Sequence, residues 1–219
     1  GQGSGQAEPE LLVLACGALA RELQALRQAN GWSGVRIRCL PASLHNRPER
    51  IAEAVRRELE AIDTRWVRVL VGYADCGTAG ALDAVLAEWG CERLPGAHCY
   101  ETFAGSRVFA ELADAEPGTF YLTDFLVRQF DRLVWRGLGL DRHPQLRPLL
   151  FGHYRRVVYL AQTRDAGLEA GARAAAERLG LPLEIRDTGY GQLAVALHRA
   201  LPAARQATAV ITDAGPCPH

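Results

Sequence analysis

The sequence predicts an α/β fold in which a Rossmann-like parallel sheet carries helices on both faces. Short apolar runs alternate with segments of helical periodicity along almost the whole chain. Parallel strands covered on both faces are apolar throughout, and the run Leu11–Ala15 has this character. With 219 residues, the chain is long enough to bury such a core without disulfide bonds.

The expected strands are short runs rich in aliphatic and β-branched residues that end at glycine, proline or polar residues. They cover residues 11–15, 35–40, 67–73, 92–94, 119–122, 157–161, 183–186 and 209–212.

The expected helices follow these strands and show apolar positions three and four residues apart. Asn46 is placed to cap one of them and Pro48 falls in its first turn, where proline is tolerated. The predicted helices cover residues 18–30, 47–62, 79–89, 123–135, 167–179 and 191–200.

Residues 9–212 are expected to form one α/β domain, with two lobes at 9–136 and 153–212 that share a cleft. The intervening segment 137–152 is rich in proline, glycine and histidine and is expected to join the lobes. Residues 1–8 are interpreted as a vector-derived or disordered stretch, and 213–219 as a C-terminal tail.

Composition excludes several classes of function. The 25 basic residues balance 25 acidic ones, so neither nucleic acid nor an anionic membrane is an expected partner. All basic residues are arginine, which excludes enzymes that need a Schiff-base, P-loop or kinase lysine. Six cysteines without a secretory signal indicate reduced thiols and a cytoplasmic location.

Polar residues gather where the predicted strands end. Cys16 follows the first strand, His45 the second, Asp75 and Cys76 the third, and Cys99 the fourth. Right-handed crossovers place all strand-to-helix loops at one edge of a parallel sheet, so these side chains are expected to converge.

Three cysteines and one histidine in such loops match the ligands of a tetrahedral zinc site, namely Cys16, Cys76, Cys99 and His45. Three cysteines alone also suit a [4Fe–4S] cluster with one free iron. Cys39 and Cys91 are expected to be plain core residues.

Further polar residues of these loops are assigned to catalysis and to substrate binding. His45, Asp75 and His98 are candidates for proton transfer or for orienting the metal ligands. Glycines at a helix start permit close approach of an anion, but the dinucleotide pattern G-x-G-x-x-G is absent, so NAD binding is not supported. The candidates for binding a small-molecule substrate are Arg47, Gly77, Thr78, Tyr100 and Asp124.

The same stretches resemble the signature blocks of the domain of unknown function 1638 family of bacterial and archaeal proteins. The resemblance extends from Leu11 to about Leu197 and is carried by the blocks 14–22, 44–49, 73–78, 98–100, 120–125 and 139–144. It implies that Cys16, His45, Cys76 and Cys99 form a recurring set. It also implies an association with corrinoid-dependent methyltransferases, although the corrinoid signature D-x-H-x-x-G is missing.

The resulting expectation is a zinc-binding cytoplasmic enzyme, a transferase or lyase, or an accessory protein of corrinoid-linked methyl-transfer or one-carbon metabolism. Its expected partners are a small ligand, a corrinoid protein or methyltransferase, and a second copy of the chain. Three alternatives stay open: a [4Fe–4S] protein using the same cysteines, a non-catalytic delivery module for a metal or ligand, and a metal-free enzyme that uses one activated cysteine, Cys76 or Cys99.

Overall fold

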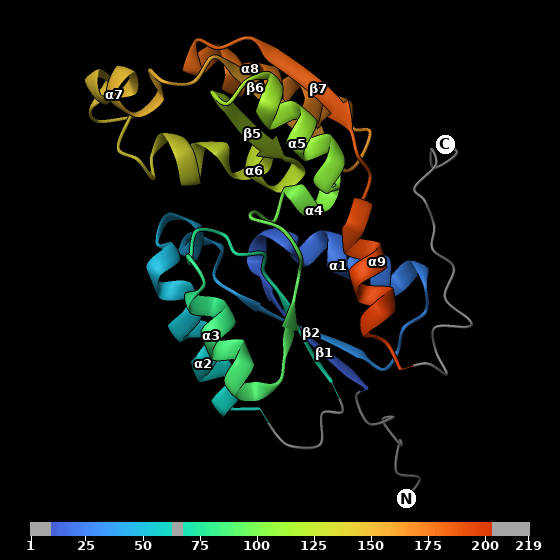
Figure 1. Ribbon diagram of the computed structural model, residues 1–219. Helices are drawn as coiled ribbons and strands as arrows, with labels where there is room; N and C mark the ends of the chain where they lie inside the picture. Colours follow the sequence, from blue (N-terminus) through green and yellow to red (C-terminus); the bar gives the residue numbers. More distant parts are fainter. Residues whose placement is uncertain (1–9, 63–67, 203–219) are drawn as a thin grey trace, which may run out of the picture. The chain divides into compact units, whose positions relative to one another are not determined.

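The structure is a computed structural model that describes residues 10–62 and 68–202. It confirms the α/β class and contains two parallel sheets (Figure 1). The described residues divide into two compact units, the first formed by residues 10–62, 68–102 and 192–202 and the second by residues 103–191. The boundaries of these units differ from those of the lobes expected from the sequence, 9–136 and 153–212. The residues predicted as a last strand, 209–212, and those at both termini lie outside the described part of the chain.

The first unit contains a four-stranded sheet whose order is β2-β1-β3-β4. Its strands are β1 (Leu11–Cys16), β2 (Val35–Leu40), β3 (Val69–Gly72) and β4 (Glu92–Arg93), and all neighbours are parallel. The central strand β1 is buried along its whole length, as its continuous apolar sequence predicts. The outer strand β2 alternates valine and isoleucine with exposed arginines, because successive side chains of a strand point to opposite faces of the sheet.

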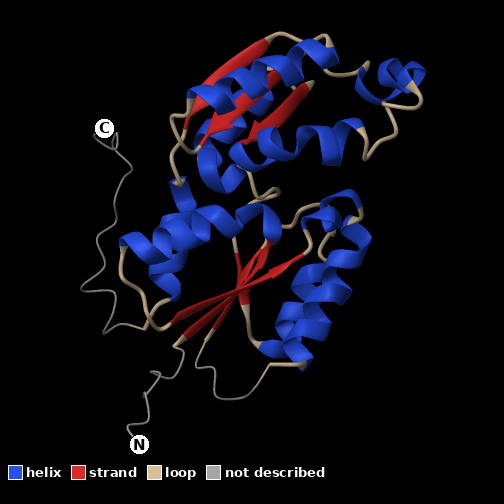
Figure 2. Ribbon diagram, turned by 180° about the vertical axis from the view of Figure 1, so that it is seen from behind, coloured by secondary structure: helices blue, strands red, loops and turns tan. Residues whose placement is uncertain are grey.

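Helices cover both faces of this sheet (Figure 2). Helices α2 (Ile51–Glu60) and α3 (Ala81–Trp89) pack together on one face. Helices α1 (Ala20–Ala29) and α9 (Gly191–Ala200) lie on the other (Figure 1). The helix predicted at 47–62 begins as a 3-10 turn over Pro48–Arg50, and a separate 3-10 segment over Ala42–Asn46 precedes it.

The second unit contains the sheet β5-β6-β7, formed by β5 (Thr119–Thr123), β6 (Arg156–Ala161) and β7 (Leu183–Asp187). Helices α6 (Asp124–Phe130) and α8 (Ala166–Leu179) pack together on one face, and α5 (Ser106–Ala115) lies on the other (Figure 1). The sequence predicted neither α5, nor α4 (Glu101–Ala104), nor α7 (Arg147–Phe151), which falls inside the expected connector 137–152. The predicted helix 123–135 changes to a π-helix over Asp131–Trp135.

No helix among the described residues combines the length and the apolar composition that a membrane crossing requires.

The strand order of the first sheet defines where a ligand site is expected. β1 has β2 on one side and β3 on the other, so the direction of the chain's crossovers reverses between β1 and β3. Open parallel sheets bind ligands in the crevice at the carboxyl ends of such strands. Cys16 is the last residue of β1 and Cys76 lies four residues beyond the end of β3.

Candidate functional site

Cys16 and His45 meet at the carboxyl edge of the first sheet. Cys16 is fully buried, and its sulfur accepts a hydrogen bond from the Ala18 amide at 3.4 Å, which starts the turn into α1. His45 lies in the 3-10 segment after β2, with Nδ1 3.4 Å from Cys16 Sγ. Gly17 makes this approach possible because a Cβ there would lie 2.9 Å from the Leu40 carbonyl oxygen.

The loop after β3 holds Cys76 in an uncommon conformation. Cys76 has a φ of 50° and Ala79 a φ of 51°, values that side-chain-bearing residues adopt only where other contacts enforce them. The Asp75 carboxylate supplies those contacts: it accepts hydrogen bonds from the Thr78 hydroxyl at 2.9 Å and from the Gly80 amide at 3.1 Å. An anion was expected to bind at Gly77 and Gly80, but the Gly80 amide donates instead to the Asp75 carboxylate of the same loop.

Cys99 reaches Cys76 through the segment after β4. The Asp75 amide donates to the Gly96 carbonyl at 3.1 Å and the Cys76 amide to the Ala97 carbonyl at 2.7 Å, so this segment continues the pairing of β3 with β4. Cys99 is buried, and its Sγ lies 2.9 Å from Cys76 Sγ.

The two pairs belong to one cluster. Gly77 packs against the Pro48 side chain, with 3.3 Å between an ideal Gly77 Cβ and Pro48 Cβ, which brings the β3 loop against the segment that follows His45. Cys16 is in the apolar cluster of β1, β3, α2 and α3, and Cys76 packs against that cluster. The structure therefore brings the four predicted residues to one edge of the first sheet as two contacting pairs, Cys16 with His45 and Cys76 with Cys99.

Burial and mutual contact set the pKa values of the thiols in different directions. Burial raises the pKa of Cys16 to about 12. The hydrogen bond from Cys99 lowers the pKa of Cys76, while that same bond and burial raise the pKa of Cys99 well above its usual value. Cys76 is therefore the thiol of the cluster that forms a thiolate most readily.

Histidines border this cluster. Removal from water lowers the pKa of His45, and the neighbouring charge of His98 lowers it further, although part of the His45 ring is exposed. Burial lowers the pKa of His98, whose ring stacks on Tyr100 with 4.9 Å between centroids. Neutral imidazoles are the form that binds a metal or accepts a proton.

Tyr73 is a residue of the site that the sequence interpretation missed. The pairing of Ala15 with Gly72 places Tyr73 beside Cys16 on the next strand, and side chains in register on parallel strands share a face. The ring is fully buried, and the hydroxyl makes no hydrogen bond of ordinary geometry with the described residues. Burial, followed by the charge of the neighbouring Cys16, raises the pKa of Tyr73. The available signal was its position as the last residue of a predicted strand, directly before the Asp75–Cys76 loop.

The other predicted site residues have different settings. Arg47 is exposed in the segment after β2. Asp124 belongs to the second unit, where it is buried and accepts hydrogen bonds from the Tyr159 hydroxyl at 2.7 Å and from the Thr163 hydroxyl at 2.6 Å. Such a carboxylate joins the end of β5 to the end of β6.

The two cysteines expected in the core differ from each other. The prediction was wrong for Cys39, which lies near the end of the outer strand β2 and is exposed. Cys91 is half-buried and packs against the apolar cluster of the first unit.

As placed, the cluster approaches the geometry of a metal centre without reaching it. Two ligands of one tetrahedral zinc ion stand about 3.6 Å apart for a sulfur and a nitrogen and about 3.8 Å apart for two sulfurs. The Cys16–His45 distance of 3.4 Å is close to the first value, whereas the Cys76–Cys99 distance of 2.9 Å is shorter than the second. Among residues 10–62 and 68–202, no three His, Cys, Asp or Glu side chains surround one point as ligands of an ion.

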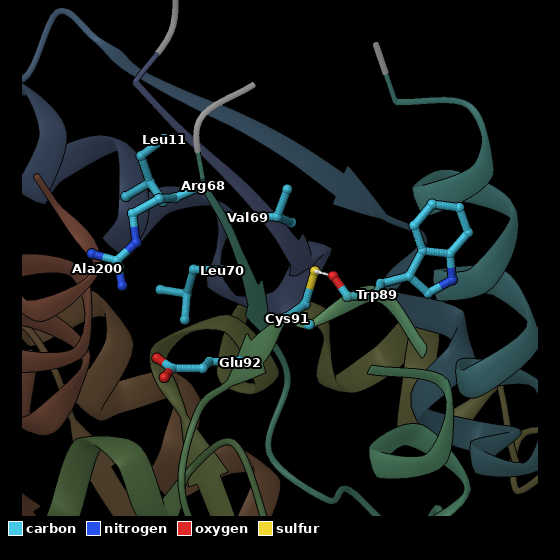
Figure 3. Close-up of a pocket in the computed structure, with 9 residues that line it drawn as sticks. Leu11, Arg68, Val69, Leu70, Trp89, Cys91, Glu92 and Ala200 are labelled. Carbon is cyan, nitrogen blue, oxygen red and sulfur yellow. Dashed lines mark hydrogen bonds between the residues drawn. The ribbon is translucent and has the colours of Figure 1, made fainter. Parts of the chain in front are cut away.

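A hollow of about 400 Å³ lies at the opposite edge of the same sheet, where β1 and β3 begin (Figure 3). Leu11, Val69 and Trp89 line it, and the Cys91 thiol there lies 3.7 Å from the Trp89 carbonyl oxygen. The candidate ligands are at the carboxyl ends of the strands, so this hollow is separate from them.

Fold and cluster together define a parallel α/β protein with cysteine and histidine donors at the switch point of its first sheet. The chain belongs to the family described as "Protein of unknown function (DUF1638)", which matches residues 39–197 and confirms the resemblance found in the sequence. The matched stretch contains His45, Cys76 and Cys99, and Cys16 precedes it. Comparisons with curated proteins and with solved structures gave no significant match.

Proposed function

We propose that the chain is a metal-binding protein whose first unit holds one zinc ion through Cys16, Cys76 and Cys99, with His45 as fourth ligand or proton carrier. One observation carries the proposal: four soft donors from four separate loops meet as two contacting pairs at the switch point. Three cysteines and one histidine form a complete tetrahedral zinc site, and three ligands leave a position open for water or substrate.

The surroundings of the cluster fit a centre of this kind. Thiolates that bind a metal accept hydrogen bonds from neighbouring groups, which tune their charge. The buried Tyr73 hydroxyl has a donor proton available beside Cys16. Occupation by zinc requires the Cys76 and Cys99 sulfurs to separate by about 0.9 Å, which side-chain rotation supplies.

The contact between Cys76 and Cys99 favours a single ion over a [4Fe–4S] cluster. Cysteines that bind different irons of a cubane are separated by the width of the cluster, farther apart than two ligands of one ion. Sulfurs 2.9 Å apart are nearer to the single-ion arrangement.

A bound zinc ion would hold thiolates at neutral pH and activate a thiol or a water molecule. Within this site, His45 and His98 stay neutral and are able to accept the proton released by an incoming thiol. We place this chemistry in methyl-group metabolism, with a corrinoid protein or methyltransferase as partner, as the resemblance in the sequence implies. If the centre binds metal but no substrate reacts, we propose that the protein delivers the metal or a ligand without catalysing a reaction.

The test is metal content in protein prepared under reducing conditions and dialysed against zinc. We expect about one zinc per chain in the wild type, and a loss of at least about tenfold in affinity for Cys16→Ser, Cys76→Ser and Cys99→Ser. Cys39→Ser and Cys91→Ser are matched controls and should bind like the wild type. Retention of full affinity in all three ligand variants would refute the proposed centre.

The second candidate function is a metal-free enzyme that uses Cys76 as nucleophile. It is favoured by the lowered pKa of Cys76 and by its φ of 50° in a strand–turn–helix loop, a setting that exposes nucleophiles in other folds. Iodoacetamide should then modify Cys76 much faster than Cys39, although Cys39 is the more exposed. Equal rates, measured by peptide mass in zinc-free protein, would exclude this candidate.

A further inference from the structure

The Cys76–Cys99 contact has a consequence that is independent of metal binding. A disulfide bond requires the two sulfurs to approach to about 2.05 Å, so from 2.9 Å they need to close only about 0.9 Å. The remaining described cysteines are placed differently: Cys16 contacts His45, Cys39 is exposed on β2, and Cys91 contacts a backbone carbonyl.

The backbone keeps these two thiols in register. The Cys76 amide donates to the Ala97 carbonyl at 2.7 Å, and the Thr102 amide donates to the Cys99 carbonyl at 3.1 Å, where α4 begins. Hydrogen bonds on both sides of the pair limit how far the thiols can separate. When one sulfur has reacted, the other is therefore close enough to attack it.

The two thiols differ in access to solvent. Cys76 is half-buried and is followed by the exposed Gly77, whereas Cys99 is only 4% exposed. A small oxidant therefore reaches the Cys76 sulfur first, and Cys99 lies behind it as the resolving thiol. This order of an accessible thiol and a protected partner is typical of redox-sensitive cysteine pairs.

We propose that Cys76 and Cys99 form a reversible disulfide in response to a hydroperoxide. The Cys76 sulfur attacks the peroxide, gains an oxygen atom to become a sulfenic acid, and one water (or alcohol) is released. The Cys99 sulfur then attacks the Cys76 sulfur, the S–O bond breaks, and a second water carries away the Cys99 proton. Two thiols are oxidised, one peroxide is reduced, and a dithiol reverses the change by exchange.

Oxidation would also regulate the proposed metal centre, a consequence that rests on the proposed function. The disulfide removes two of the three thiolates and leaves only Cys16 and His45. Zinc affinity of oxidised protein should fall by at least about a hundredfold, because two ligands do not complete a tetrahedral site.

The experiment treats reduced, zinc-free full-length protein with hydrogen peroxide and measures intact mass and linked peptides. Cys217 lies outside the described residues, so every variant is also prepared with Cys217→Ser. We expect the mass to fall by two hydrogens, a Cys76–Cys99 peptide to appear, and dithiothreitol to reverse both. In Cys99→Ser the sulfenic acid at Cys76 should persist and be trapped by dimedone, whereas Cys76→Ser should give neither product.

Cys39→Ser is the matched control and should oxidise like the wild type. A disulfide that links other cysteines, or oxidation that adds oxygen to Cys76 in the wild type without forming the bond, would overturn the proposal. Zinc binding is measured separately on reduced protein, so the two proposals fail independently. A disulfide in a chain that binds no zinc when reduced supports the redox pair and refutes the metal centre.

Discussion

Replacement of Gly17 by alanine tests the close approach on which the candidate site depends. An alanine Cβ at this position would lie 2.9 Å from the Leu40 carbonyl oxygen and 3.3 Å from the Ala42 amide nitrogen. Ordinary contacts of a Cβ begin near 3.4 Å, so the loop after β1 and the loop after β2 must separate by about half an ångström. Both contacts are with backbone atoms, which cannot rotate away.

Two opposing effects set the expected loss of stability in Gly17→Ala. Overpacking of this kind costs about 1–3 kcal/mol. Alanine restricts the unfolded chain and returns about 0.4–1 kcal/mol where the backbone conformation suits it, as the φ of Gly17 does. The expected net loss is about 1–2 kcal/mol, which corresponds to a fall in Tm of about 2–8 °C for a chain of this size.

Calorimetry of the reduced, zinc-free protein measures this loss, and zinc titration of the same variant reports the separation of Cys16 from His45. Gly167→Ala is the matched control, because Gly167 is exposed in the first turn of α8 and its nearest neighbour is the end of the Asp165 side chain. The control should lose less stability than Gly17→Ala, because its contact at 3.0 Å is with a side-chain oxygen of Asp165, which can shift, and not with backbone. A Gly17→Ala variant that unfolds at the wild-type temperature would refute the argument that these loops are in close contact.

Three further predictions concern single groups. Tyr73→Phe removes a buried hydroxyl that makes no hydrogen bond of ordinary geometry, so the metal-free variant should be at least as stable as the wild type. Its zinc affinity should fall about tenfold. A large loss of stability in calorimetry would show that the hydroxyl has a structural partner. Burial raises the pKa of Cys16 to about 12, and the pKa of Cys99 is also raised, so zinc must displace both protons near neutral pH. Apparent zinc affinity, measured by chelator competition, should therefore rise about 100-fold per pH unit, and a rise of tenfold or less would contradict this assignment. In the wild type, several hydrogen-bond donors point at the Asp124 carboxylate, and Asp124→Asn would place an amide donor against them. The free energy of unfolding, measured with denaturant, should fall by about 2–4 kcal/mol. Asp114→Asn, at an exposed position, should leave it almost unchanged.

The fold class and most elements could be predicted from the sequence because hydrophobic periodicity is a local property. The bounds of β2 and α9 agree with the prediction, since alternation in the outer strand and the apolar positions of the helix are unambiguous. Helices α5 and α7 were missed, because the glycines and prolines around them resemble those of a connecting loop.

The candidate site was predicted in part for the same reason. Polar residues at strand ends are visible in the sequence, and the structure places Cys16 beside His45 and Cys76 beside Cys99 at one edge of the sheet. The role of Tyr73 depends on which strand lies beside β1, and the role of Asp75 depends on the backbone conformation of its own loop. The position of Tyr73 at the end of a strand is visible in the sequence, but its place beside Cys16 and the hydrogen bonds of Asp75 are not.

The sequence by itself determined that this is a parallel α/β protein with thiols and an imidazole at strand ends, because the apolar pattern and the positions of its breaks are written along the chain. Only the tertiary structure decided that Cys16 contacts His45 and that Cys76 contacts Cys99. It also decided that the strands divide into two sheets. Strand order arises from packing between distant segments, and that order determines which loops become neighbours.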